Sequence, residues 1–439
     1  MMWWLIVPLI ASMLSLTKAR EVATLASAAI CVVGSIELMK HGIISKYLYV
    51  DRFSALIVFI TSAIYLLSAL YSIHFVRCVE KKFYKTSYYY ALLNLFAFTM
   101  MVTAVLRSIG LMWVGLEATT IVSAILVAFE KKKASIEAAW RYIIVASAGL
   151  GLALISIITL HAYANTLLWD KIVVSVEVAN LALVFALIGF GTKIGLFPMH
   201  TWLPDAHGTA PPAVSAMLSA NLLPLAMLCY YRILQIAIHS GSHIAQPLTC
   251  IFGIVTAFMA GIFAMPQRII KRLFAYSSMD VMGIALVGLG LGGKALLGSM
   301  IILLIHAFAK AGLFFCAGNV ITCLGVERID EVSGLLRISK LTGLAMLMNA
   351  FAVTGVPPFA TFLGELIILA YSLQYPKLAI ALATVILISF LAVNYHVTNM
   401  TFGKGEGRIS RFAELVAIIS ALLSFGLSIP IVWEVIRHF

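Results

Sequence analysis

The sequence predicts an all-α polytopic membrane protein with about fourteen transmembrane helices, and its composition is the first reason. Of the 439 residues, 62% are hydrophobic and 11% are charged, and the mean hydropathy is +1.05. A soluble domain carries roughly 25% charged residues. Apolar runs of about 18 residues or more, the length that spans a bilayer, recur along the whole chain. Because no polar stretch is long enough to bury a core of its own, we expect one membrane domain over residues 1–439.

The predicted helices follow one another with short loops between them. We place them at 3–17, 21–39, 53–76, 88–105, 109–128, 139–161, 176–197, 211–238, 245–265, 273–291, 295–322, 341–374, 377–400 and 411–433. The first run has no basic segment before it and no small-residue cleavage site, so we interpret it as a helix and not as a cleaved signal peptide. Residues 1–86 then hold the first three helices, and residues 403–439 hold the fourteenth.

Proline and glycine interrupt the seventh and the twelfth predicted helices near their middles, at residues 195–198 and 355–358. Proline removes a helix hydrogen bond, and broken backbone at membrane depth is tolerated only where protein or water satisfies it. Broken helices at corresponding positions of two halves indicate an ion path through inverted repeats. The candidate repeats are residues 87–240, with helices four to eight, and residues 241–402, with helices nine to thirteen. The alternative is that each proline is a simple kink.

The basic residues of the loops predict the orientation. Loops after the odd-numbered helices hold 19 of the 30 Lys and Arg, Lys81 and Lys82 among them, and the other side holds 9. Because basic loops favour the cytoplasm, we expect both termini on the outer side of a cell membrane. Topology and anionic lipid account for the net charge of +12 better than nucleic acid does. The Ile-rich composition and short loops favour a prokaryotic source, and an archaeal or thermophilic one among these.

Nothing in the sequence predicts a redox centre, a metal site or a nucleotide site. The six cysteines form no C-x-x-C pair. No H-E-x-x-H, phosphate-binding loop, G-x-G-x-x-G or carboxylate dyad appears in a suitable context. We therefore expect the chain to carry no cofactor and no metal.

Five of the ionisable residues within the predicted spans are the principal candidates, since a charge at membrane depth costs roughly 2.5–3.5 kcal/mol on insertion scales. They are Glu117, Lys193, His306, Lys310 and Glu365. Lys193 precedes the first break, Glu365 follows the second, and His306 and Lys310 share a helix face because they are four residues apart. A buried amine holds its proton beside a carboxylate and releases it when the carboxylate is absent, which suits a proton relay. The alternatives are a Glu117–Lys193 ion pair that only pins helices and a satisfied core histidine at His306.

Asp280, His200, His207 and Asn221 are accessory candidates. Asp280 lies near the start of the predicted helix 273–291, so a role at the helix N-terminus competes with a relay role. His200 and His207 flank residues 202–206 at the cytoplasmic end of the seventh helix. They would either form a mouth through which protons reach the interior or pack the loop.

Two stretches resemble a known family. Residues 191–207, GTKIGLFPMHTWLPDAH, resemble the signature of the proton-antiporter-like subunits of respiratory complex I, Mrp-type sodium/proton antiporters and membrane-bound group 4 nickel–iron hydrogenases. Residues 306–315, HAFAKAGLFF, match the eleventh-helix motif of that family. Within it the chain is most similar to component F of hydrogenase-4 and formate-hydrogenlyase-type complexes, through PMHTW at 198–202, IDEVSGLLR at 329–337 and PPF at 357–359.

The resemblance implies a role for each matching position. Glu117 and Lys193 would be a modulating pair, His306 and Lys310 the central relay, and Glu365 the terminal carrier. It also implies a non-catalytic subunit without a cofactor. Its partners would be antiporter-like, small multi-helix and quinone-channel-like membrane subunits and a separate peripheral redox arm, with no nucleic acid.

One position departs from the family pattern. Many members carry a lysine in the eighth helix where this chain has Pro224. Water held by Ser219 and Asn221 would bridge this position, or the proton path is interrupted there. The predicted function is therefore an ion-translocating, most simply proton-translocating, subunit of a redox-driven complex such as a membrane-bound hydrogenase. A non-pumping scaffold subunit and a Mrp-type sodium/proton antiporter subunit are the alternatives.

Overall fold

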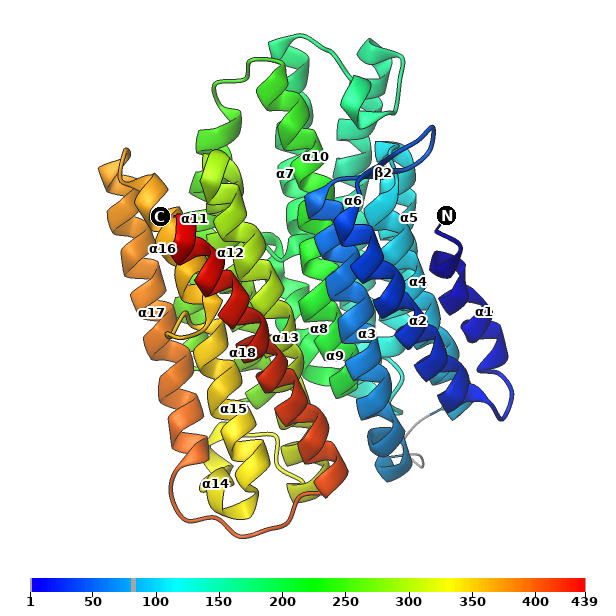
Figure 1. The fold of residues 1–439 in the computed structure, drawn as a ribbon, viewed down its shortest axis with the longest axis vertical. Helices are drawn as coiled ribbons and strands as arrows, with labels where there is room; N and C mark the ends of the chain where they lie inside the picture. Colours follow the sequence, from blue (N-terminus) through cyan, green and yellow to red (C-terminus); the bar gives the residue numbers. More distant parts are fainter. Residues whose placement is uncertain (1, 80–83, 439) are drawn as a thin grey trace.

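The computed structural model describes residues 2–79 and 84–438, and these are almost entirely helical (Figure 1). Lys81 and Lys82 of the basic loops lie outside the described residues. The α-helices are α1 (Val7–Leu14), α2 (Arg20–Lys40), α3 (Arg52–Val79), α4 (Thr86–Val105), α5 (Ile109–Val127), α6 (Lys133–Ala164), α7 (Val176–Ile194), α8 (Trp202–Thr209), α9 (Pro212–Met217), α10 (Leu223–His239), α11 (Ala245–Ala264), α12 (Ile270–Leu291), α13 (Gly293–Leu324), α14 (Leu335–Ile338), α15 (Lys340–Val353), α16 (Ala360–Ser372), α17 (Pro376–Thr401) and α18 (Arg411–His438). Shorter turns are the 3₁₀ helices η1 (Trp3–Ile6), η3 (Trp169–Lys171), η4 (Met199–Thr201) and η6 (Ile329–Glu331) and the π-helical turn η5 (Leu218–Leu222).

The helices form one elongated bundle with α1 at one edge and α17 at the other (Figure 1). Most residues of the segment Pro212–His239 and of helices α12, α3 and α13 are buried. Helices α2, α6, α17 and α18 present most of their surface outward. Large apolar side chains such as Trp140 of α6 and Leu387 of α17 are exposed there, as expected where lipid is the solvent.

Twelve helices of the described chain are long and apolar enough to cross a membrane. Three shorter apolar segments accompany them, Trp3–Leu14, Lys340–Val353 and Ala360–Ser372. The all-α membrane fold is thus confirmed, whereas the count of fourteen spans and the inverted repeats stay predictions.

Two short strands close the loop between α2 and α3. Strand β1 (Ile43–Ile44) pairs antiparallel with β2 (Tyr49–Val50). Beyond α4, Arg107 donates from Nε and Nη2 to the two carboxylate oxygens of Asp170 at 2.8 and 2.6 Å. These hydrogen bonds hold the pKa of the Asp170 carboxyl below its usual range. Loops from separate parts of the chain are tied together at this end of the bundle.

Both predicted helix breaks are present. Helix α7 ends at Ile194, and Gly195 follows in the left-handed conformation with φ of 85°. Its N–H and that of Leu196 both donate to the Gly191 carbonyl, at 3.0 and 2.8 Å, which closes the helix end inside the protein. Helix α15 ends at Val353, and α16 begins only at Ala360.

Helices α6 and α12 begin at Lys133 and Ile270, before the predicted starts at 139 and 273. Lys271 is buried within α12 since its ammonium donates to the Ala210 carbonyl at 2.8 Å. This tertiary contact stabilises a helix that includes basic residues, which the sequence analysis assigned to a loop. Asp280 consequently lies in the middle of α12, and the predicted alternative of a helix N-terminal role is wrong.

Candidate functional site

Lys193 lies in the last turn of α7, directly before the first break, and its side chain is completely buried. Its Nζ donates to Thr120 Oγ1 of α5 at 2.7 Å and to the Tyr142 hydroxyl of α6 at 2.5 Å. It also lies 4.6 Å from the centre of the Tyr142 ring, in cation–π contact. The Tyr142 hydroxyl is 2.9 Å from Ser123 Oγ. Neutral hydroxyl groups thus hold the amine in this state.

Glu117 lies one turn before Thr120 on α5 and is half-buried. Its Oε1 accepts from Ser147 Oγ of α6 at 2.6 Å, and its Oε2 has no partner among the described residues. The carboxylate lies within electrostatic range of Lys193 without a direct contact, because the amine turns to the hydroxyls instead. The predicted close approach of Glu117 and Lys193 in at least one state stays a prediction.

Helix α8 carries two rings into the bundle just beyond the break. Trp202 Nε1 donates to the Thr192 carbonyl at 2.7 Å, and the indole lies 4.5 Å from the Tyr142 ring. His207 is completely buried, and its ring centre lies 6.2 Å from that of Trp202. Its Nδ1 lies 2.9 Å from a backbone carbonyl of α8, and its Nε2 has no partner within the described chain. His207 therefore lies inside the bundle, within electrostatic range of Lys310, and not at a surface mouth.

His200 and Asp205 stand nearer the end of the bundle. His200 is buried and stacks on Phe263 with ring centres 5.4 Å apart, which favours the packing role of its two predicted alternatives. Asp205 bridges Arg141 of α6 and Arg272 of α12, each at 3.4 Å. A cavity of about 290 Å³ opens beside Asp205. The charged mouth next to α8 is thus formed by a carboxylate and two arginines.

Lys310 and His306 lie on α13, and both are completely buried. Lys310 Nζ donates to the Phe274 carbonyl of α12 at 2.9 Å. Neither ring nitrogen of His306 has a hydrogen-bond partner in the described part of the chain. Phe314, one turn after Lys310, packs on His207 with ring centres 5.5 Å apart. The predicted central pair therefore sits between α8 and α12.

The π-helical turn η5 directly precedes Pro224, at the position where the resemblance implies a lysine. Ser219 Oγ lies 2.7 Å from Ser278 Oγ of α12. Asn221 is completely buried, and neither Nδ2 nor Oδ1 finds a partner among the residues that the structure describes. The turn thus adds an unsatisfied amide to the interior beside α13.

Asp280 and Glu365 complete the set. Asp280 Oδ2 accepts a hydrogen bond from Ser389 Oγ of α17, and the carboxylate lies within electrostatic range of Lys310 and of Glu365. Glu365 of α16 is buried against the second break. A side chain added at Gly355, whose φ is 65°, would overlap the Glu365 carboxylate. The break therefore makes room for this acid.

The structure brings the predicted residues into one series through the bundle. Its members, in order, are Glu117, Lys193, His207, Lys310, Asp280 and Glu365. Within this order the Tyr142 and Trp202 rings stand between Lys193 and His207. Among the described residues no group of three His, Cys, Asp or Glu stands together as metal ligands. Each member of this series is a group that can bind and release a proton.

Sequence reasoning missed the hydroxyl groups that contact these residues. They are Thr120, Ser123, Tyr142, Ser147 and Ser389. Hydroxyl side chains in apolar runs commonly bond to their own helix, so such residues carry little signal. The one usable signal was spacing, because Thr120 lies three residues after Glu117 and hence on the same face of α5.

Comparison with known proteins decides the family. Residues 107–391 match the family described as NADH:quinone oxidoreductase/Mrp antiporter, TM, which is more than half of the chain. The chain belongs to this family. The hydrogenase-4 component F homolog of Methylacidiphilum infernorum is 29% identical over 405 residues, which cover 87% of this chain and 85% of that protein.

Two solved structures share the fold. The Mrp complex of a Dietzia species contains a chain with a TM-score of 0.87 at 18% identity, covering 97% of this chain and 93% of that one. The membrane-bound sulfane sulfur reductase, an archaeal respiratory membrane complex, matches with a TM-score of 0.87 at 22% identity and the same coverage. The predicted family resemblance is confirmed, and the protein is a multi-pass, antiporter-like membrane subunit. The five principal site residues all lie within the matched range 107–391.

Proposed function

We propose that this chain translocates protons as the antiporter-like subunit of a redox-driven membrane complex. The observation that carries the proposal is the series from Glu117 to Glu365, in which Glu117 faces Lys193 electrostatically, His207, Lys310, Asp280 and Glu365 do so in turn, and two aromatic rings stand between Lys193 and His207. A single charge at membrane depth costs roughly 2.5–3.5 kcal/mol on insertion scales. One ion pair would be enough to hold two helices together. A series of ionisable groups across the bundle supports ion movement instead.

Lys193 is the switching group of the proposed path. Thr120 and Tyr142 hold its amine, and the Glu117 carboxylate lies within electrostatic range. When Glu117 moves closer, Lys193 retains its proton. When Glu117 is neutralised or withdrawn, the proton is released past the Tyr142 and Trp202 rings toward His207.

Lys310 receives the proton in the second half. Its only hydrogen bond in the described chain is to the Phe274 carbonyl, so no carboxylate locks the amine in place. Asp280 draws the proton onward and Glu365 carries it out, toward the exit or the next subunit. His306 and Asn221 add polar atoms that have no partner among the described residues. Ordered water commonly satisfies such groups, and we propose that it bridges the position of Pro224.

The chemistry of the series favours H⁺ over Na⁺. A sodium site would gather several oxygen ligands around one point, as hard cations require. The middle of this series offers the Lys193 and Lys310 amines and the His207 imidazole, which repel a cation when protonated. Protons, in contrast, bind to each of these groups in turn.

Two inverted repeats, 87–240 and 241–402, are supported by matching chemistry. The second helix of each carries a half-buried or buried acid next to a serine, Glu117 with Ser147 and Asp280 with Ser389. Each broken helix carries an ionisable group beside its break. We propose that the chain is a single membrane domain built from these repeats, the three N-terminal helices and the C-terminal helix.

We also propose a cell membrane location with both termini on the outer side, on the evidence of the basic loops. The Ile-rich composition and short loops support a prokaryotic source, and an archaeal or thermophilic one among these. The named relatives and neighbours include a hydrogenase-4 component, a Mrp complex and a sulfur reductase complex. We propose corresponding partners for this chain, namely other antiporter-like, small multi-helix and quinone-channel-like subunits and a peripheral redox arm.

The test uses the purified complex in proteoliposomes, with redox turnover and internal pH recorded together. Lys193→Ala and Glu365→Gln are expected to leave assembly largely intact and to abolish proton movement by this subunit, because neither new side chain carries a proton. Lys377→Ala removes an exposed lysine of α17 and is the matched control. Proton movement at the wild-type rate in both variants would establish the scaffold alternative. Proton movement that requires added Na⁺, and that both variants lose, would favour the Mrp-type alternative.

A further inference from the structure

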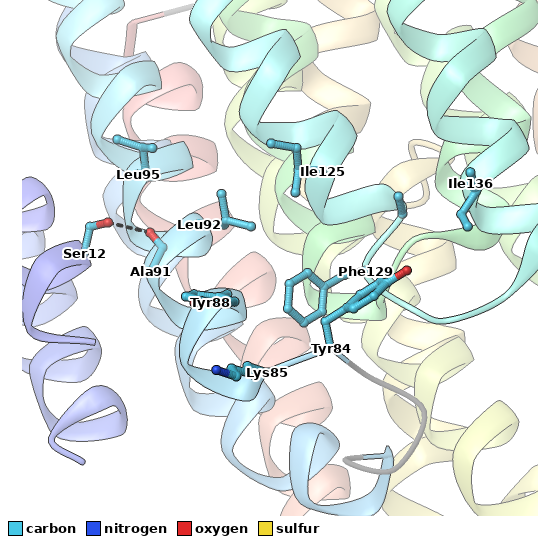
Figure 2. A pocket seen from close by; sticks show the side chains of 11 residues that line it. Ser12, Tyr84, Lys85, Tyr88, Ala91, Leu92, Leu95, Ile125, Phe129 and Ile136 are labelled. Carbon is cyan, nitrogen blue, oxygen red and sulfur yellow. Dashed lines mark hydrogen bonds between the residues drawn. The ribbon is translucent and has the colours of Figure 1, made fainter. Parts of the chain in front are cut away.

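A groove of about 690 Å³ lies at the α1 edge of the bundle, away from the charged series (Figure 2). Its walls are apolar side chains from three helices, Leu92 and Leu95 of α4, Ile125 of α5 and Ile136 of α6. Ser12 of α1 closes one side and donates to the Ala91 carbonyl at 2.8 Å. Neither the charged series nor the proposed proton path uses this groove.

The polar rim of the groove lies at its other end, where Figure 2 shows Tyr84, Lys85 and Tyr88. Lys85 Nζ lies 5.7 Å from the Tyr88 ring centre, and Lys131 Nζ lies 5.5 Å from the Tyr84 ring centre. Both lysines are exposed, and neither pairs with a carboxylate in the described chain. The neighbouring Lys132, in contrast, pairs with Glu130 at 2.8 Å. Lys85 and the phenol rings of Tyr84 and Tyr88 thus line the polar end of the groove, with Lys131 beside Tyr84, on the side rich in basic loops.

The chemistry of the groove favours a lipid as its occupant. A flexible hydrocarbon chain matches the apolar walls of this space of about 690 Å³, and a phosphate group at its head would meet the two lysines. Tyrosine and lysine at the membrane surface are also the residues that anchor to headgroups.

We propose that this groove binds an anionic glycerophospholipid, with an acyl chain between α4, α5 and α6 and the phosphate at Lys85 and Lys131. Charge complementarity selects an anionic lipid over a zwitterionic one, because neither amine pairs with a carboxylate among the described residues. The lipid would fill the gap beside α1 and tie that helix to the bundle. The groove lies outside the proposed proton path, so the test measures lipid binding and not proton transport.

The experiment uses the whole complex in phosphatidylcholine nanodiscs that contain a phosphatidylglycerol probe with a photoreactive acyl chain. Adducts are expected in peptides that contain Leu92, Leu95, Ile125 or Ile136. Unlabelled phosphatidylglycerol should compete better than phosphatidylcholine. The double variant Lys85→Gln, Lys131→Gln should lower the affinity about 30-fold, from roughly fivefold per lysine. Lys404→Gln changes an exposed lysine outside the groove and should have no effect.

A second variant tests the apolar part without altering charge. Ile125→Trp fills the groove and is expected to remove the adducts while the complex stays assembled. The proposal is overturned if adducts map elsewhere, if phosphatidylcholine competes equally, or if the lysine variant binds like the wild type. It is also overturned if a photoreactive residue at position 92 captures a partner-subunit peptide in place of lipid.

Discussion

The Tyr142 hydroxyl offers the sharpest test of how Lys193 holds its proton. It accepts a hydrogen bond from Lys193 Nζ at 2.5 Å and lies 2.9 Å from Ser123 Oγ. Tyr142→Phe removes this one oxygen. The ring remains, with its cation–π contact to Lys193 at 4.6 Å and its packing on Trp202 at 4.5 Å. The helices should therefore stay in place while the amine loses one of its two hydroxyl partners.

The size of the effect follows from the kind of bond that is lost. A hydrogen bond to a charged group contributes roughly 1.5–3 kcal/mol. Since about 1.4 kcal/mol corresponds to a factor of ten, the protonated amine becomes about 10- to 100-fold less favoured. The hydrogen bond to Thr120 at 2.7 Å remains. Lys193 should therefore still bind a proton, although less strongly. We expect proton translocation per redox turnover to fall about tenfold or more.

The assay measures proton movement and redox turnover in the same proteoliposomes. Tyr230→Phe is the matched control, because Tyr230 is also completely buried and its hydroxyl contacts Thr249 at 2.6 Å outside the charged series. Wild-type proton movement in Tyr142→Phe would refute the assigned role. An equal loss in Tyr230→Phe would show that any missing buried hydroxyl has this effect.

Three further predictions concern the second break, a loop contact and the orientation. Gly355→Ala adds roughly 1–3 kcal/mol of backbone strain and displaces the Glu365 carboxylate, so proton movement should fall several-fold in an assembled complex; an unchanged rate would contradict the placement of Glu365. Asp170→Asn should lower the melting temperature at pH 7, because a carboxyl whose pKa Arg107 depresses stabilises the fold above the unfolded pKa of about 3.9. That difference should shrink as the pH falls below about 4, and a constant difference would exclude the linkage. Cysteines placed at 131–133 should resist labelling from outside intact cells, whereas ready labelling would reverse the proposed orientation.

The sequence predicted the helical fold and both breaks because their causes are local. Long apolar runs require helices in lipid, and Pro198 and Pro358 cannot continue one regularly. The start of α12 was not predictable, since Lys271 enters the helix only by donating to the Ala210 carbonyl from another segment. The π-helical turn before Pro224 was missed, although a proline, which cannot donate the regular helix hydrogen bond, is a local signal of an irregular turn.

The site was predictable in its charges and not in its neutral partners. Glu117, Lys193 and Glu365 are conspicuous because charge is expensive at membrane depth. Tyr142 and Thr120 are ordinary residues of apolar helices, and only the fold places them on the Lys193 amine. Charge alone favoured a direct Glu117–Lys193 pair, whereas hydroxyls take that place in this state.

The departure at Pro224 bears on whether the path is continuous. A lysine at that position would stand between the two halves, and its loss appeared to favour a scaffold. His207 changes that argument, because α8 brings its ring between Trp202 and Phe314, within electrostatic range of Lys310. A titratable group thus stands between the halves without a lysine, and its Nε2 has no partner among the described residues. We infer that the histidine of α8 shares the bridging role with the ordered water proposed above, so that Pro224 shapes the adjacent π-helical turn without interrupting the path.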